Sequence, residues 1–90
     1  GVDQLTKVMA LEWAKLGVRV NAIAPTYFET DLVKQLRNDP ERFNFINERT
    51  PMGRWGYPEE LEGLVVFLAA KASDFITGQT IYIDGGWTAW

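Results

Sequence analysis

The chain contains neither cysteine nor histidine in its 90 residues. Without cysteine it cannot form a disulfide bond, a thiolate metal site or a cysteine nucleophile. Without histidine it lacks the side chain that most often transfers protons near neutral pH. The two absences together exclude several classes of enzyme, and no metal site is expected.

An excess of positive charge and long apolar runs are absent as well. Nine Lys and Arg residues against twelve Asp and Glu give a net charge of −3, and no block of like charge stands out. We expect no nucleic-acid partner, because a nucleic-acid surface carries a basic patch. The longest apolar stretch, residues 64–70, is too short to span a bilayer, and no signal-like segment begins the chain. We therefore expect no membrane partner and a cytoplasmic location.

What is present is a regular order of helical and strand patterns. Apolar residues recur at helical spacing up to Gly17, and residues 18–24 are β-branched and small, as in a strand covered on both faces. Two short helices are expected next, the second opening at Asp39. An irregular connection leads to a helix from Pro58 to about Ala72, and a strand is expected over residues 80–84.

This order predicts an α/β fold with two parallel, neighbouring strands. Two strands alone form a marginal sheet, and the helix that begins at Pro58 is apolar most of the way round. We therefore expect these residues to be a fragment of a larger domain, with more sheet for the helices to cover.

Four segments, in order, carry a resemblance to a known family: GVDQLTKVMALEWAKLGVRVNAIAP, PTYFET, PMGRWGYPEELEGLVVFLA and FITGQTIYIDGG. Together they resemble the C-terminal third of the short-chain dehydrogenase/reductase family, over essentially all 90 residues. The ending DGGWTAW is most similar to the gluconate 5-dehydrogenase and 2-deoxygluconate dehydrogenase branch. The resemblance implies the C-terminal part of a Rossmann-type doubly wound parallel sheet. Residues 1–90 would then be the C-terminal portion of one domain, with a lid insertion at about residues 30–52.

The resemblance also implies a cofactor, NAD or NADP, in the complete enzyme. In open α/β sheets ligands bind beyond the carboxyl ends of the strands, and the loop after the first strand leaves such an end. The nicotinamide carboxamide would pair with the backbone near Phe28 and with the Thr30 hydroxyl. The cofactor-binding residues implied are Pro25, Thr26, Tyr27, Phe28 and Thr30. The alternative is that Pro25 breaks the strand, Thr30 caps a helix, and Tyr27 and Phe28 fill the core.

Thr26 departs from the family, which usually has glycine there. Glycine permits a positive φ or a close approach of backbone to ligand, whereas a β-branched residue with positive φ is strained. If the family geometry is kept, Thr26 is strained or crowds the cofactor; if it relaxes, the loop moves.

Other positions have two readings each. The substrate-lid residues implied are Phe28, Leu32, Phe45 and Met52, which can equally pack the lid onto the body. Arg54 is expected to form, with Glu59 and Glu60, either a salt bridge or a helix start, and Asp84 is expected to form a turn.

For the complete enzyme the resemblance implies an NAD(P)-dependent oxidoreductase that interconverts a secondary alcohol and a ketone on a small-molecule substrate, a sugar acid such as gluconate. This chain would supply the nicotinamide-side loop, the substrate lid and an interface in a homo-oligomer, a tetramer in the complete enzyme. None of the three tyrosines has a lysine four residues on, and no glycine-rich phosphate loop occurs. The 90 residues alone therefore carry no catalytic residue and are expected to be inactive. The alternative is a non-catalytic piece that acts only in self-assembly or in association with full-length subunits.

Overall fold

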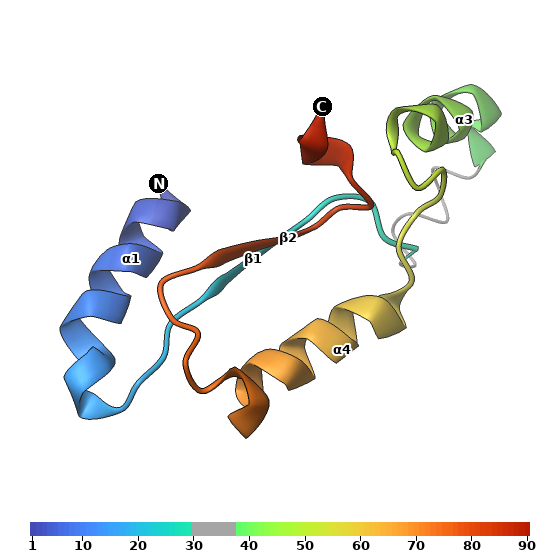
Figure 1. Ribbon diagram of the computed structural model, residues 1–90. Helices are drawn as coiled ribbons and strands as arrows, with labels where there is room; N and C mark the ends of the chain where they lie inside the picture. The colour runs from blue at the N-terminus through green and yellow to red at the C-terminus, as the bar shows by residue number, and fades with distance from the viewer. Residues whose placement is uncertain (30–37) are drawn as a thin grey trace. The chain divides into compact units, whose positions relative to one another are not determined.

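The computed structural model describes residues 1–29 and 38–90 (Figure 1). The described elements are α1 (Val2–Trp13), η1 (Ala14–Leu16), β1 (Ala22–Pro25), α3 (Pro40–Arg49), α4 (Pro58–Ala69), η3 (Lys71–Ser73), β2 (Thr80–Ile83) and η4 (Trp87–Ala89). β1 and β2 are parallel neighbours in a two-stranded sheet. The order of elements and the pairing confirm the predicted α/β class.

The chain divides into two compact units. The first comprises Gly1–Ala24 and Gly63–Tyr82, and the second comprises Pro25–Glu62 and Ile83–Trp90. In the first unit, α1 lies on one side of the paired strands and the Gly63–Ala69 end of α4 on the other (Figure 1). Helices on both faces of a parallel sheet are the arrangement expected of a doubly wound fold.

α1 contacts the chain around β2 through small and polar side chains. The Thr80 hydroxyl donates to the Asp3 carboxylate at 2.7 Å, and Ala10 is buried beside Gly78. The helical pattern ends at Gly17, whose N–H donates to the Ala14 carbonyl. The sequence therefore predicted this helix and its end correctly.

β1 begins later than the sequence predicts. We expected a strand over residues 18–24, whereas β1 is Ala22–Pro25. Before this strand, the Gly78 N–H donates to the Val20 carbonyl at 2.7 Å, and side chains supply further bonds. The Val20 N–H donates to the Thr77 hydroxyl at 3.0 Å, and the Asn21 side-chain amide donates to a carbonyl of the same loop. Because the Thr77 hydroxyl takes the Val20 N–H, the regular ladder begins only at Ala22.

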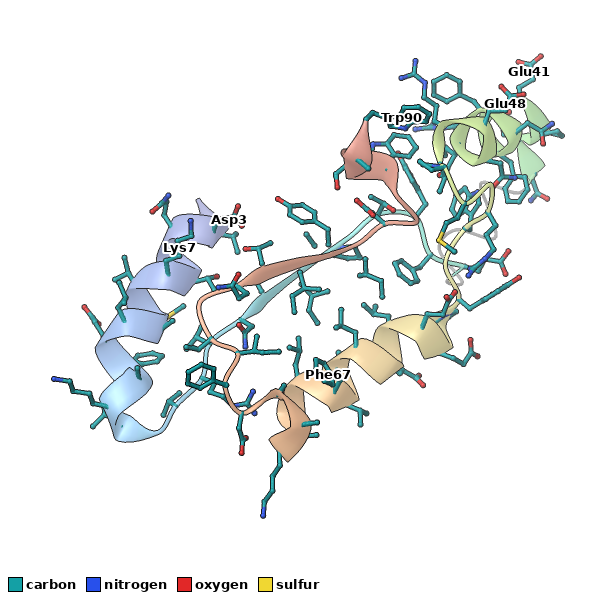
Figure 2. All side chains as sticks on the ribbon, in the orientation of Figure 1. Asp3, Lys7, Glu41, Glu48, Phe67 and Trp90 are labelled. Atoms are coloured by element: carbon teal, nitrogen blue, oxygen red, sulfur yellow. The ribbon has the colours of Figure 1, made fainter. Side chains whose placement is uncertain are left out.

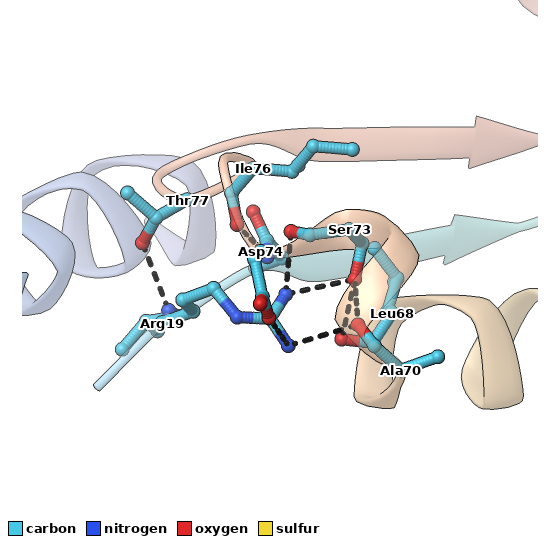
Figure 3. Close-up of polar contacts among 9 residues, drawn as sticks. Arg19, Leu68, Ala70, Ser73, Asp74, Ile76 and Thr77 are labelled. Atoms are coloured by element: carbon cyan, nitrogen blue, oxygen red, sulfur yellow. Dashed lines mark hydrogen bonds and ion pairs between the residues drawn. The ribbon is translucent and has the colours of Figure 1, made fainter. Parts of the chain in front are cut away.

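Arg19 joins the chain before β1 to the turn after α4 (Figure 3). Its Nη1 donates to both the carbonyl and the hydroxyl oxygen of Ser73, at 2.8 Å each, and its Nη2 lies 3.8 Å from the Asp74 carboxylate. Ser73 is completely buried. One buried hydroxyl and one guanidinium therefore satisfy several polar groups that would otherwise lack a partner away from water.

The same serine accounts for the end of α4. The sequence predicts this helix to about Ala72, but it ends at Ala69, and Ala70 is extended. The Ser73 hydroxyl donates to the Leu68 carbonyl at 2.9 Å. The last carbonyl groups of a helix have no partner within it, so Ser73 caps the C-terminus of α4 and the chain leaves the helix early.

The second unit contains a parallel bridge between Phe28 and Gly56. The Gly56 N–H donates to the Tyr27 carbonyl at 2.9 Å, and the Glu29 N–H donates to the Gly56 carbonyl at 2.8 Å. The buried Phe28 ring lies so close to Gly56 that a Cβ there would be 2.5 Å from Phe28 Cε1. Only glycine fits, because packed atoms do not approach so closely.

α3 is the second of the two short helices predicted before the irregular connection. The Asp39 carboxylate accepts the Arg42 N–H at 3.3 Å, and Pro40 is the first residue of the helix. The predicted start at Asp39 is therefore confirmed. The other predicted helix falls on residues that lie outside the described part of the chain.

The two units differ in how well their apolar side chains are buried. Of the buried apolar side chains in residues 1–29 and 38–90, all but Ala10 belong to the second unit. Large apolar residues of the first unit are exposed along α1, η1 and α4: Leu5, Leu11, Leu16, Val66 and Phe67. This agrees with the expectation that these helices cover more sheet than two strands provide. No helix in the described residues is long and apolar enough to cross a membrane.

We expect Ser73→Ala to lower the free energy of unfolding by about 1–3 kcal/mol, because it leaves the Leu68 carbonyl without its partner. The measurement is urea-induced unfolding of the full-length protein. Lys71→Ala, an exposed substitution in the same 3-10 helix, is the control and should change stability by less than about 0.5 kcal/mol. Equal effects of the two substitutions would contradict the role of Ser73.

Gly56→Ala should destabilise the full-length protein by about 1–3 kcal/mol, because the added methyl group overlaps the Phe28 ring. Gly63→Ala is the matched control. Gly63 lies within α4 with open space around it, so alanine there should stabilise the helix by about 0.5–1 kcal/mol. Chemical denaturation measures both, and the same sign for the two variants would show that the contact between Phe28 and Gly56 does not form.

Candidate functional site

The candidate site is a cavity of about 100 Å³ in the second unit, at the loop that follows β1. Three segments far apart in the sequence line it: the loop after β1, the connection between α3 and α4 together with the first turn of α4, and the end of β2 with the turn that follows. The lining residues are Thr26, Tyr27, Phe28, Thr50, Met52, Arg54, Gly56, Glu60, Ile83, Asp84 and Gly85. Sites that enclose a whole small ligand measure roughly 300–1,000 Å³. This cavity can therefore take only a ring-sized part of a ligand.

The backbone of Phe28 is the chemically distinctive part of the loop. The backbone groups on either side of it already have hydrogen-bond partners, because the Tyr27 carbonyl and the Glu29 N–H both bond to Gly56. The N–H and C=O of Phe28 itself make no hydrogen bond to another residue in the described part of the chain. One free donor and one free acceptor on the same residue match a ligand group that both accepts and donates, such as a carboxamide.

Aromatic rings fix the position of this loop. The Tyr27 ring lies 5.2 Å from that of Trp55 and 5.6 Å from that of Trp87, both at tilted angles. Phe43 of α3 stacks on Trp55 at 5.4 Å. Contacts of this kind stabilise by about 0.5–1.5 kcal/mol each beyond the area they bury. The Tyr27 ring, and with it the loop, is therefore held by contacts with both the Trp55 ring and the Trp87 ring.

Thr26 adopts an ordinary backbone conformation. It has no positive φ. The threonine that stands where the family usually has glycine is therefore free of the left-handed strain that the sequence allowed for. It also lines the cavity, so its side chain is part of the site wall.

Arg54 and Glu60 form the polar wall of the cavity. Arg54 Nη1 and Nη2 donate to the two Glu60 carboxylate oxygens at 2.7 and 3.0 Å, and the guanidinium lies 4.9 Å from the centre of the Tyr57 ring. The Arg54 hydrogen bond, together with the Tyr57 N–H, lowers the pKa of Glu60 to about 2. The bond to Glu60 also raises the pKa of Arg54. Both groups are charged near neutral pH, and the predicted salt bridge is confirmed.

Glu60 also stabilises the start of α4. Its carboxylate accepts the Tyr57 N–H at 2.9 Å, and Pro58 is the first residue of the helix. A carboxylate that bonds to a free N–H ahead of a helix stabilises the helix start. The predicted start of this helix is therefore confirmed, and Arg54 is held by a side chain that is itself fixed.

Asp84 organises the turn after β2, as the sequence predicted. Its carboxylate accepts the N–H groups of Gly86 and Thr88 at 2.9 and 3.0 Å, and the Thr88 hydroxyl as well. The Thr88 hydroxyl and these N–H groups lower the pKa of Asp84. With its oxygens occupied in this way, Asp84 shapes the cavity wall without offering a free base.

The residues singled out from the sequence have different positions. Thr26, Tyr27 and Phe28 line the cavity together with Met52, whose side chain is 63% exposed. Pro25 is the exposed last residue of β1 and is not part of the lining. Phe45 does not line the cavity and lies under the Arg49 guanidinium on α3. Thr30 and Leu32 lie outside the described residues.

The sequence did not single out Thr50, Gly56, Ile83 and Gly85 as site residues, although all four line the cavity. Gly56 and Gly85 lie in the two segments quoted for their resemblance to the family, the PMGRWGYP connection and the DGG turn. These two glycines could have indicated the cavity wall from the sequence, because glycine in a connection often marks a close approach of the backbone to another group. No group of three or more carboxylates within residues 1–29 and 38–90 is placed to hold a metal ion.

Comparison with known proteins identifies the family. Residues 1–88 match the family model described as enoyl-(acyl carrier protein) reductase. The chain is 53% identical over 89 residues to 2-dehydro-3-deoxy-D-gluconate 5-dehydrogenase of Escherichia coli K12, covering 99% of this chain and 35% of that protein. It is 46% identical over 87 residues to gluconate 5-dehydrogenase of Gluconobacter oxydans, covering 97% and 34%. The chain thus spans about a third of the length of these curated relatives.

A solved structure agrees in fold. The gluconate 5-dehydrogenase of Burkholderia cenocepacia, in complex with NADP and tartrate, superposes with a TM-score of 0.89 at 47% identity, covering 99% of this chain and 35% of that one. The likeness confirms the Rossmann-type fold expected from the sequence. The chain belongs to the short-chain dehydrogenase/reductase family.

Proposed function

We propose that the whole protein is an NAD(P)-dependent dehydrogenase that interconverts a secondary alcohol and a ketone on a sugar acid such as gluconate. The relatives named for gluconate and for 2-dehydro-3-deoxy-D-gluconate support this substrate class. The related structure from Burkholderia cenocepacia, in complex with NADP and tartrate, supports a nicotinamide cofactor and a hydroxy-acid ligand. When bound, the cofactor accepts or donates the hydride.

The observation that carries the proposal is the N–H and C=O of Phe28, which have no partner among the described residues, beside a ring-sized cavity. A nicotinamide carboxamide has one acceptor and one N–H₂ donor, and this backbone pair complements both. Pro25, Thr26, Tyr27 and Phe28 would hold the nicotinamide side of the cofactor. Thr30 joins them on the family resemblance alone.

The substrate would be bound against the lid. Phe28 and Met52 line the cavity, and we propose Leu32 and Phe45 as further lid residues on the family resemblance. The exposed side chain of Met52 is unbranched and adapts to different shapes, as suits a wall that closes over a ligand. The exposed apolar surface of the first unit would be covered by the rest of the domain and by further subunits of a homo-oligomer.

The direct test uses the purified full-length protein. We expect oxidation of gluconate or a related sugar acid with NAD⁺ or NADP⁺, followed by the absorbance of the reduced nicotinamide. A linear-chain secondary alcohol without a carboxylate serves as the control substrate. Absence of turnover with every sugar acid, together with absence of cofactor binding, would refute the proposed function.

Thr26→Gly tests the cofactor loop. Because Thr26 has no positive φ, glycine relieves no strain, and its extra chain freedom must be lost on binding. We expect the affinity for the reduced cofactor to fall about two- to fivefold, equivalent to the roughly 0.5–1 kcal/mol that glycine costs. Nicotinamide fluorescence measures the affinity in the full-length protein. Tighter binding by the glycine variant would show instead that the threonine crowds the cofactor.

A further inference from the structure

Residues 84–90, which we call the clasp segment, bind to the parts of the chain that form the lid side of the cavity. The Met52 N–H donates to the Gly85 carbonyl at 3.0 Å. The Trp87 ring lies 5.6 Å from that of Tyr27. Trp90 lies beside α3 (Figure 2), and its indole N–H donates to the Arg49 carbonyl at 3.0 Å. The clasp segment therefore contacts the cofactor loop, the connection and α3 at once.

The bond from Trp90 has a specific role at the end of α3. Arg49 is the last residue of this helix, and the last four carbonyl groups of a helix have no partner within it. Thr50 leaves the helix in an extended conformation, and its N–H and hydroxyl both bond to the Ile46 carbonyl. The Trp90 indole supplies the partner that the Arg49 carbonyl would otherwise take from water. Because 84% of Trp90 is exposed, burial does not explain its position.

The clasp segment also fits tightly against the connection after α3. Gly85 has a φ of +60°, and a Cβ there would lie 2.8 Å from Thr50 Cγ2 and 3.6 Å from Met52 Cβ. Any side chain at this position would push the two segments apart. Thr50, Met52 and Gly85 all line the cavity. The spacing of these two walls is therefore set by the contact between the clasp segment and the connection.

We propose that the clasp segment positions α3 and residues 50–52 at the cavity, and that Trp90 is a positioning residue for substrate binding. The proposal rests on the proposed function in one respect, that the cavity wall receives the sugar acid. Trp90 does not line the cavity, so it acts through α3. A wall held in its bound position loses less conformational freedom when the ligand binds, so the affinity is higher.

The test compares Trp90→Phe with wild type in the full-length protein. Phenylalanine keeps an aromatic ring and removes the N–H donor. Ala89→Ser, at the exposed neighbouring position, is the control. Two measurements are made: hydrogen exchange of peptides from α3 and the connection, without any ligand, and the KM and kcat for the sugar acid at saturating cofactor.

For Trp90→Phe we expect exchange at the end of α3 to be about two- to tenfold faster, the range set by one lost hydrogen bond. The KM should rise by a similar factor, with kcat within twofold of wild type and unchanged cofactor affinity. The control should match wild type in all of these. Unchanged exchange would overturn the proposal. A fall in kcat accompanied by a lower melting temperature, with no change in KM, would overturn it as well. If wild type shows no dehydrogenase activity, the proposed function fails, and the exchange measurement alone decides whether the clasp exists.

Discussion

The close contact of the Phe28 ring with Gly56, and the two backbone hydrogen bonds beside it, decide the geometry of the second unit. The bonds commit the carbonyl of Tyr27 and the N–H of Glu29, while the N–H and C=O of Phe28 bond to no other residue within 1–29 and 38–90. The same contact brings the loop after β1 against the connection that carries Arg54. This side of the cavity therefore follows from one approach of two chain segments that only glycine permits.

The two units differ in what their residues can achieve by themselves. In the second unit, Phe28, Ile46 and Trp55 are buried and aromatic rings pack around Tyr27. In the first unit, the polar network of Arg19 and Ser73 is satisfied while large apolar side chains of α1 and α4 remain exposed. In the first unit, therefore, the polar groups of this network are hydrogen-bonded, whereas large apolar side chains are not buried. The relatives are about three times as long as this chain.

Local rules predicted the elements well. Asp39 with Pro40, Gly17, and the acidic start of α4 each marked a helix end through a mechanism within a few residues, and each is where the sequence placed it. The errors are at ends set by side-chain hydrogen bonds that the apolar pattern does not show. β1 starts late because Thr77 binds the Val20 N–H, and α4 stops early because of Ser73. Thr77 lies far from residues 18–24 in the sequence, and the apolar pattern up to Ala72 does not show that the adjacent Ser73 hydroxyl turns back to the Leu68 carbonyl.

The part of the site that follows from a general rule of the fold was predictable, and the part that depends on contacts between distant segments was not. The position of the loop after β1 follows from the general rule for open α/β sheets, and Thr26, Tyr27 and Phe28 do line the cavity. The opposite walls depend on pairing across the chain, which the sequence does not reveal: Gly56 beneath a ring and Gly85 against Thr50. Family resemblance pointed to both segments but assigned them only structural roles.

The cavity draws its walls from the beginning, middle and end of the second unit's sequence. Contacts between residues far apart in a chain close large loops and form late in folding, after local helices. The cavity is consequently absent until the remote pairings are complete. A nascent or partly unfolded chain would keep α3 and α4 as fluctuating helices without the space that these segments enclose in the folded protein.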